Sequence, residues 1–263
     1  MLGPEFILSK ARNPERRIGI GAAEDLDRVQ ASVSISNSSG YGRSKVYHDP
    51  LEMIRDLRKG ELDAAVRGSL DSTQILRSIK SEFSLGSVQR MALLQPRNGR
   101  MFFFAPVGVD EGWTYEQKID LVKNGARLMR QMGVEPKVAF LSGGRKGDEG
   151  RHPIVDRTMK DAARLAEDCT KLGIEASDRQ ILIEDAARDC NLIIAPDGIS
   201  GNLIFRTLHF LGDGRAMGAV VLNIDKVFVD TSRAKESYLD SIAMASALVG
   251  TRKLVREPEH AKI

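Results

Sequence analysis

Short apolar runs alternate with amphipathic stretches along the whole chain of 263 residues. The runs are rich in β-branched residues and apolar almost throughout, as is typical of strands that helices cover on both faces. In the amphipathic stretches, apolar residues recur three or four positions apart and so share one helix face. This alternation predicts an α/β fold of mostly parallel strands with helical crossovers. The expected strands are Arg17–Ala22, Asp63–Gly68, Val88–Leu94, Met101–Val107, Lys137–Leu141, Asn191–Ala195, Ala219–Asn223 and Lys226–Val229, and the expected helices are Pro50–Lys59, Ser72–Phe83, Thr114–Gly133, Ile154–Gly173, Ser200–Leu211 and Ala234–Leu254.

Charge and composition exclude several classes of protein. The 39 basic and 36 acidic residues are mixed along the chain and leave a net charge of only +3, so we expect no nucleic-acid partner. No apolar run approaches the roughly 18 residues of a membrane span, and no signal peptide is recognisable, so we expect a cytoplasmic protein without a membrane partner. Cys169 and Cys190 suit buried thiols, and the four histidines lack metal-ligand spacing, so no metal site is expected.

Three loops that follow expected strands carry the candidate chemistry, because ligands bind at such places in open α/β sheets. The first contains Gly143, Gly144, Arg145, Lys146 and Gly147. Its glycines let backbone amides approach an anion, and its two cations add positive charge. The spacing is neither that of a Walker loop nor that of a dinucleotide fingerprint. A flexible surface loop with solvated cations is the alternative interpretation.

The second loop contains Asp197, Ser200, Gly201 and Asn202 and opens an expected helix. Free amides at a helix start favour a phosphate or a carboxylate. A Pro-Asp-Gly turn followed by Ser200 as helix cap explains the same residues without a ligand.

The third loop contains Ser232 and Arg233, and the helix expected after it contains Asp240. Arg233 and Asp240 are seven positions apart, so a continuous helix would place them on nearly one face. The alternative here is a helix cap followed by a solvated charge pair.

Taken together, the loops resemble the phosphate acetyltransferase and butyryltransferase superfamily. The resemblance is clear over about residues 115–250 and faint in the first third. It rests on four ordered motifs: Lys-Gly, His-Pro and Val-Asp; Pro-Asp and Gly-Asn; Leu-Gly and Gly-Ala; and Asp-x-Ser-Arg. The matching residues are Lys146, Gly147, His152, Pro153, Val155, Asp156, Pro196, Asp197, Gly201, Asn202, Leu211, Gly212, Gly218, Ala219, Asp230, Ser232 and Arg233.

This resemblance implies an isopropylmalate-dehydrogenase-like, two-lobed, three-layer αβα fold. Residues 1–87 and 221–263 would form one discontinuous lobe and residues 88–220 the other, with the active cleft between them. It also implies a homodimer, a small anionic substrate, and coenzyme A as substrate rather than as bound cofactor. Ser232 and Arg233 would polarise an acyl-phosphate carbonyl, and Asp240 would deprotonate the thiol.

Within the superfamily, the chain resembles the methanogen marker family of the MtxX type, whose name refers to a methyltransferase subunit. A group transferase of methanogen metabolism with acyl-phosphate and coenzyme A chemistry is the leading hypothesis. Methyl transfer among tetrahydromethanopterin, corrinoid and coenzyme M, with a partner subunit, is one alternative, although no corrinoid-binding Asp-x-His-x-x-Gly segment is present. A non-catalytic ligand-binding subunit is another, favoured by Asp148, Ile199 and Ala234 where the superfamily carries serine, an acidic residue and glycine.

Overall fold

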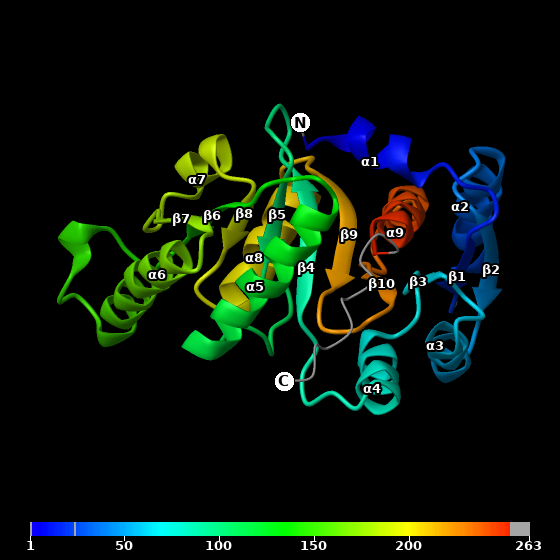
Figure 1. Ribbon diagram of the computed structural model, residues 1–263, viewed down its shortest axis with the longest axis horizontal. Helices are drawn as coiled ribbons and strands as arrows, with labels where there is room; N and C mark the ends of the chain where they lie inside the picture. The colour runs from blue at the N-terminus through cyan, green and yellow to red at the C-terminus, as the bar shows by residue number, and fades with distance from the viewer. Residues whose placement is uncertain (1, 24, 253–263) are drawn as a thin grey trace, which may run out of the picture.

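The computed structural model describes residues 2–23 and 25–252, in which ten strands form one twisted sheet. The order is β2-β1-β3-β10-β9-β4-β5-β8-β6-β7, and β2 and β7 lie toward the two ends of the long axis (Figure 1). The strands are β1 (Arg17–Gly21), β2 (Arg43–Tyr47), β3 (Ala64–Val66), β4 (Arg90–Gln95), β5 (Phe102–Ala105), β6 (Lys137–Phe140), β7 (Glu175–Asp178), β8 (Leu192–Ile194), β9 (Arg215–Val221) and β10 (Val227–Asp230).

Two parallel groups of strands are joined by an antiparallel centre. Strands β2, β1, β3 and β10 run parallel to one another, and so do β5, β8, β6 and β7. Between the groups, β9 pairs antiparallel with both β10 and β4, and β4 pairs antiparallel with β5. The two parallel groups therefore run in opposite directions. The loops that follow their strands leave the sheet at opposite ends of the strands.

Helices cover both faces of the sheet. On one face, a single large apolar cluster contains side chains of α1 (Pro4–Ala11), α2 (Leu26–Ser38), α5 (Tyr115–Gln131), α6 (Pro153–Lys171) and α9 (Leu239–Arg252). On the other face there are two separate clusters. One includes α3 (Pro50–Lys59) and α4 (Ser72–Glu82), and the other includes α7 (Ile183–Asp189) and α8 (Gly198–Arg206). The second face is thus divided near the centre of the sheet.

The α/β class and the three-layer αβα architecture are confirmed, and all eight expected strands are present with shifted ends. Two edge strands, β2 and β7, were not expected, nor were α1, α2 and α7. The sequences of the two edge strands, RSKVY and EASD, contain no apolar run, because an edge strand need not be buried on both faces. The two lobes remain a prediction. Their expected boundaries fall between α4 and β4 and at the end of β9, and residues 253–263 of the first lobe lie outside the described chain.

The expected start of the last helix, at Ala234, is wrong. Residues 234–238 form a loop, and α9 begins at Leu239, whose amide is hydrogen-bonded to the hydroxyl of Ser237. A loop is required here because Lys235 turns back and buries its side chain against β9. The expected end of this helix, Leu254, lies outside the described residues.

Candidate functional site

A cavity of about 400 Å³ lies where the second face of the sheet is divided. Ala216 and Ala219 on β9 line it, and both belong to the apolar cluster under α7 and α8. Their small side chains leave room above the strand. Between them, Gly218 has φ +128° beside an irregularity in the β4–β9 register, so the backbone is distorted at this point. The other lining residues are Arg67, Ser72, Arg90, Val107, Asn202, Phe205, Arg206, His209, Asp230, Thr231, Ser232, Arg233, Ala234 and Lys235.

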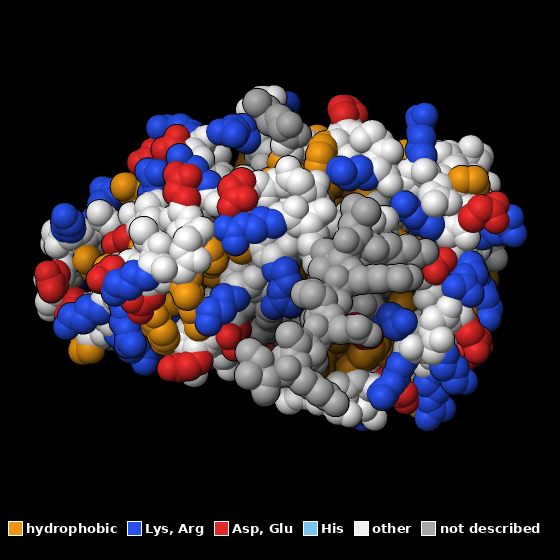
Figure 2. Space-filling view, in the orientation of Figure 1, with side chains coloured by type: hydrophobic (Ala, Val, Ile, Leu, Met, Phe, Trp, Pro, Cys, Tyr) orange, Lys and Arg blue, Asp and Glu red, His pale blue; other side chains and the backbone are white. Residues whose placement is uncertain are grey.

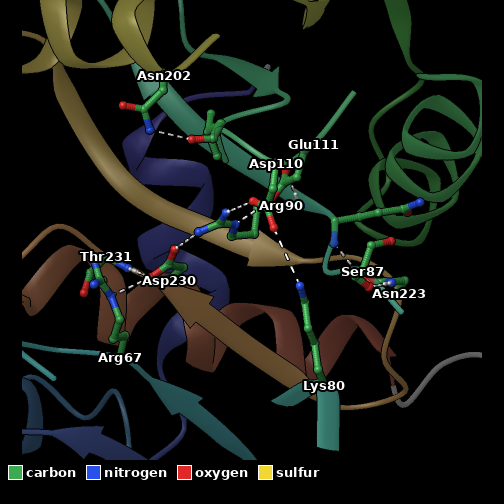
Figure 3. A network of polar contacts seen from close by, with 12 residues as sticks. Arg67, Lys80, Ser87, Arg90, Asp110, Glu111, Asn202, Asn223, Asp230 and Thr231 are labelled. Atoms are coloured by element: carbon green, nitrogen blue, oxygen red, sulfur yellow. Dashed lines mark hydrogen bonds and ion pairs between the residues drawn. The ribbon is translucent and has the colours of Figure 1, made fainter. Parts of the chain in front are cut away.

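A buried ion network lies beside this cavity (Figure 3). Arg90 is at its centre, with Nε 2.6 Å from Glu111 and Nη1 2.8 Å from Asp230. The other oxygen of Asp230 is 2.6 Å from Nε of Arg67, and Asp110 lies 3.5 Å from Arg90 at the exposed end. The network therefore ties the ends of β3 and β10 to the start of β4 and to the loop after β5.

Burial and charge act in opposite directions in this network. Burial alone lowers the pKa of Arg90, but the carboxylates of Asp230 and Glu111 outweigh it and the net pKa is raised. For Glu111, burial raises the pKa more than the positive charge of Arg90 lowers it. Arg90 therefore stays charged at any pH at which the protein is folded.

The loop after β10 brings Ser232 and Arg233 to the cavity. Asp230 accepts a hydrogen bond from the amide of Thr231, whose hydroxyl donates to the carbonyl of Gly68. Arg233 is 60% exposed, and its nearest carboxylate is 3.9 Å away on Asp71, the N-cap of α4. The guanidinium is therefore available to a ligand, beside a backbone that the buried network fixes.

Asp240 does not lie on a common helix face with Arg233, because α9 starts only one residue before it. Both its oxygens are held by Arg215, at 2.6 and 2.7 Å. Asp240 lines a neighbouring cavity of about 510 Å³, which shares His209, Ala216, Ala234 and Lys235 with the first. The two cavities are thus adjacent and share these four residues as a wall, and Asp240 lies on the far side of that wall.

The segment 196–202 reaches the cavity only through Asn202. Helix α8 begins at Gly198, and its N-cap is Asp197 rather than Ser200. The Asp197 carboxylate accepts hydrogen bonds from the amides of residues 199 and 200, so these amides are already occupied. Gly201 lets the helix approach the preceding loop, since an added Cβ would lie 2.0 Å from the carbonyl of Pro106. Asn202 donates to the carbonyl of Val107 and lines the cavity.

The loop 143–147 does not line this cavity, so two of the three candidate loops reach it, one of them through Asn202 alone. Five strand steps separate β6 from β10, roughly 24 Å at about 4.8 Å per step. The amides of Gly143, Arg145 and Lys146 are bonded to Thr158, Asp148 and Gln180. Gly144 is buried, and an added Cβ at Gly147 would meet no atom within 4 Å.

Sequence reasoning did not single out Arg67, Arg90, Arg206, His209 or Lys235. One signal was available: Arg67 directly follows an apolar strand and Arg90 begins another, and a charge at such a place requires a buried partner. The segment 68–73 contributes Ser72 to the cavity.

Comparisons with known proteins agree with this fold. Residues 51–176 match the family model described as phosphate acetyl/butaryl transferase. This region begins in the first third of the chain, where we expected only a faint resemblance, and ends before the motifs at 196–202 and 230–233. A methyltransferase mtx subunit X of Methanosarcina mazei, whose name gives that role as provisional, is 42% identical over 230 residues, covering 87% of this chain and 79% of the relative.

The chain belongs to the mtx subunit X family. Over residues 51–176 it contains a region that matches the phosphate acetyl/butyryltransferase superfamily, to which the motifs also pointed. A phosphate butyryltransferase of Clostridium acetobutylicum is 23% identical over 77% of this chain and 73% of its own. The phosphotransacetylase structure of Streptococcus pyogenes superposes with a TM-score of 0.74 at 16% identity, covering 97% of this chain and all of its own, and so supports the fold.

Two further observations concern the described part of the chain. Within residues 2–23 and 25–252, no group of three or more histidine, cysteine or acidic side chains is placed to hold a metal ion. None of the helices described is both long and apolar enough to cross a membrane. Figure 2 shows lysine and arginine side chains interspersed with acidic ones over the visible face, apart from the area under the grey atoms.

Proposed function

We propose that this protein is a group transferase that binds a small anionic substrate beside Ser232 and Arg233. The observation that carries this proposal is the charge of the cavity lining. Five cationic side chains, those of Arg67, Arg90, Arg206, Arg233 and Lys235, face one carboxylate, that of Asp230. Arg67 and Arg90 are neutralised by buried partners, and the buried amine of Lys235 is bonded to Ala216 and Ser241. Arg206 and Arg233 are therefore the cations that remain for a ligand.

An acyl phosphate fits this lining. Arg233 can bind two phosphoryl oxygens with its planar fork while the hydroxyl of Ser232 donates beside it. The acyl group would lie against the apolar side chains of Val107, Phe205 and Ala219. In transfer to coenzyme A, the thiol gives up its proton, sulfur bonds to the acyl carbon, and the carbon–oxygen bond to phosphate breaks. Positive charge at Arg233 stabilises the departing phosphate.

A methyltransferase subunit is the second candidate, supported by the names of the relatives at 42% and 43% identity. In that case, the same cations would bind an anionic methyl donor or acceptor, and a partner subunit would supply the rest of the site. A non-catalytic ligand-binding subunit is supported by the occupied amides of the loop 143–147 and by Ile199 at the start of α8. We further propose a cytoplasmic homodimer with the lobes defined above, for which sedimentation in solution is the test.

Thermal-shift measurements with acetyl phosphate, phosphate, coenzyme A, methyl-tetrahydromethanopterin and coenzyme M distinguish these candidates, because a ligand that binds the folded state stabilises it. Stabilisation by acetyl phosphate and coenzyme A, with acetyl-coenzyme A formed, is the expected result. Binding of the methyl carriers alone supports the methyltransferase candidate, and binding without product supports the non-catalytic one.

Arg233→Lys tests the residue that carries the proposal. We expect phosphate to bind about tenfold more weakly to this variant, because lysine keeps the charge but loses the two-pronged hydrogen bond. Arg188→Lys is the matched control, since Arg188 is 73% exposed, has one weak ion pair and lines neither the cavity of Arg233 nor the neighbouring cavity of Asp240. Equal phosphate affinities of wild type, variant and control would contradict an anion site at Arg233.

A further inference from the structure

Lys235 is a buried amine in the wall that the two adjacent cavities share. Its exposed fraction is 8%, and it lines both the cavity of Ser232 and Arg233 and the neighbouring cavity of Asp240. It lies only two residues after Arg233, at the point where the loop turns back to β9. No step of the proposed transfer reaction described above involves this side chain.

The contacts of this amine are unusual for a lysine. Nζ donates to the carbonyl of Ala216 at 2.6 Å and lies 3.2 Å from the hydroxyl of Ser241. No carboxylate in the described part of the chain lies within ion-pair distance of it. An ammonium group has three hydrogens, so one position on Nζ is left without a protein partner among the described residues.

The charged groups around Lys235 come from four elements. Asp240 on α9 favours its charged form, and Arg215 on β9 opposes it. His209, from the π-helical turn 207–211, lines the same wall, and Arg28 on α2 donates to the backbone carbonyl of Lys235. Burial is the largest effect and lowers the pKa of Lys235 from its ordinary 10.5 to about 8. The neutral amine is therefore well populated in mildly alkaline solution.

We propose that Lys235, in place of Asp240, accepts the proton of the acceptor group during transfer. This inference rests on the proposed function. The neutral amine takes the proton from the acceptor, for instance a thiol, and the resulting anion bonds to the transferred carbon as the leaving group departs. The ammonium formed keeps its hydrogen bonds to Ala216 and Ser241, and it returns the proton to solvent or to the leaving phosphate.

Asp240 is poorly suited to this task in the present fold. Arg215 donates hydrogen bonds to both of its oxygens, so both are already engaged within the protein. Lys235 differs in having a burial-lowered pKa and an unpaired position on Nζ. Both properties are typical of lysines that act as bases.

The first test compares pH profiles of kcat for acetyl transfer in wild type, Lys235→Gln and Asp240→Asn. We expect wild-type kcat to rise with pH through a midpoint of about 8, because only the neutral amine accepts a proton. Lys235→Gln keeps a donor for the Ala216 carbonyl but cannot take a proton. Its kcat should fall at least about a hundredfold and should no longer rise with pH. Its affinity for phosphate should stay within about threefold of that of wild type. Lys171→Gln, at a lysine 63% exposed, is the matched control.

Asp240→Asn separates the two candidate bases. In this variant kcat should still rise with pH, but with a midpoint at lower pH, because the negative charge that favours the ammonium form of Lys235 is gone. If Asp240→Asn instead abolishes turnover, while Lys235→Gln keeps both turnover and the rise of kcat with pH, the inference is overturned.

The second test needs no turnover. Lysine labelled with carbon-13 at Cε, with Lys235→Gln used for assignment, should give one resonance that titrates near pH 8. Because the unfolded chain then binds more protons than the folded one between about pH 8 and 10.5, wild type should gain stability relative to Lys235→Gln across this range. Turnover combined with titration of Lys235 near 10.5 contradicts this inference alone. Titration near 8 without turnover on any acyl phosphate contradicts the proposed function and the inference with it.

Discussion

The loop 143–147 and the loop 230–233 each follow a strand and carry positive charge, but they differ in what their hydrogen-bond donors do. The first has three glycines and two cations, yet three of its amides already bond to Thr158, Asp148 and Gln180. In the second, the backbone is fixed by a buried ion network, while the guanidinium of Arg233 is 60% exposed with its nearest carboxylate 3.9 Å away. An anion needs donors that the protein has left unfilled. Glycine content and positive charge alone do not supply them.

The largest effect that separates the loops should come from the network behind the second one. Arg90→Met leaves Glu111 and Asp230 buried without their shared cation, and we expect a loss of about 3–5 kcal/mol in the free energy of unfolding. Urea titration measures it. The matched variant Arg43→Met removes an ion pair with Glu15 in which both side chains are 72% exposed, and it should cost under about 1 kcal/mol. Similar losses in both variants would mean that the network does not hold the second loop in place.

A smaller effect should distinguish the glycines of the segments 196–202 and 143–147. Gly201→Ala would place a Cβ 2.0 Å from the Pro106 carbonyl, so α8 must move, at a cost of about 1–3 kcal/mol. Gly147→Ala meets nothing within 4 Å and should change stability by less than about 0.5 kcal/mol. Thermal unfolding of both variants checks this difference. A neutral Gly201→Ala would show that close packing of α8 is not required.

The smallest effect is expected where the sequence suggested a large one. Arg145→Gln and Lys146→Gln should leave the affinity for phosphate within about twofold of wild type, because these exposed side chains lie outside the cavity lined by Arg233. Calorimetric titration of each variant with phosphate provides the measurement. A tenfold loss in either one would identify the loop 143–147 as an anion site after all.

Periodicity was sufficient to predict the α/β class and the buried strands, because parallel strands covered on both faces must be apolar throughout. It failed at β2 and β7, whose edge positions relax that requirement, and at α1, a short helix of eight residues. It also missed the start of α9. The pattern from Ala234 onward suits a helix, but the buried tether of Lys235 to Ala216 is a tertiary contact that no local pattern reveals.

The candidate site was predictable only in part. Ser232 and Arg233 follow a strand and belong to a motif, so sequence alone could single them out. Arg67 and Arg90 reach the cavity through pairing of β3, β10, β9 and β4, an order that does not follow the chain. The direction of the strands was also hidden. Because the centre of the sheet is antiparallel, the loops after β6 and β10 leave at opposite ends of the strands. In a wholly parallel sheet, both loops would lie at the same end.

The strand order β3-β10-β9-β4 also bears on how the protein folds. The cavity is assembled from stretches as far apart as Arg67 and Lys235, and the bonds that support it join Arg90 to Asp230 and Thr231 to Gly68. Contacts between such distant residues require the closure of long loops, which slows folding. The halves of the sheet around β1 and β8 contain more local pairings and can form earlier. Competence to bind an anion should therefore appear among the last events of refolding, after most of the helical structure has already returned.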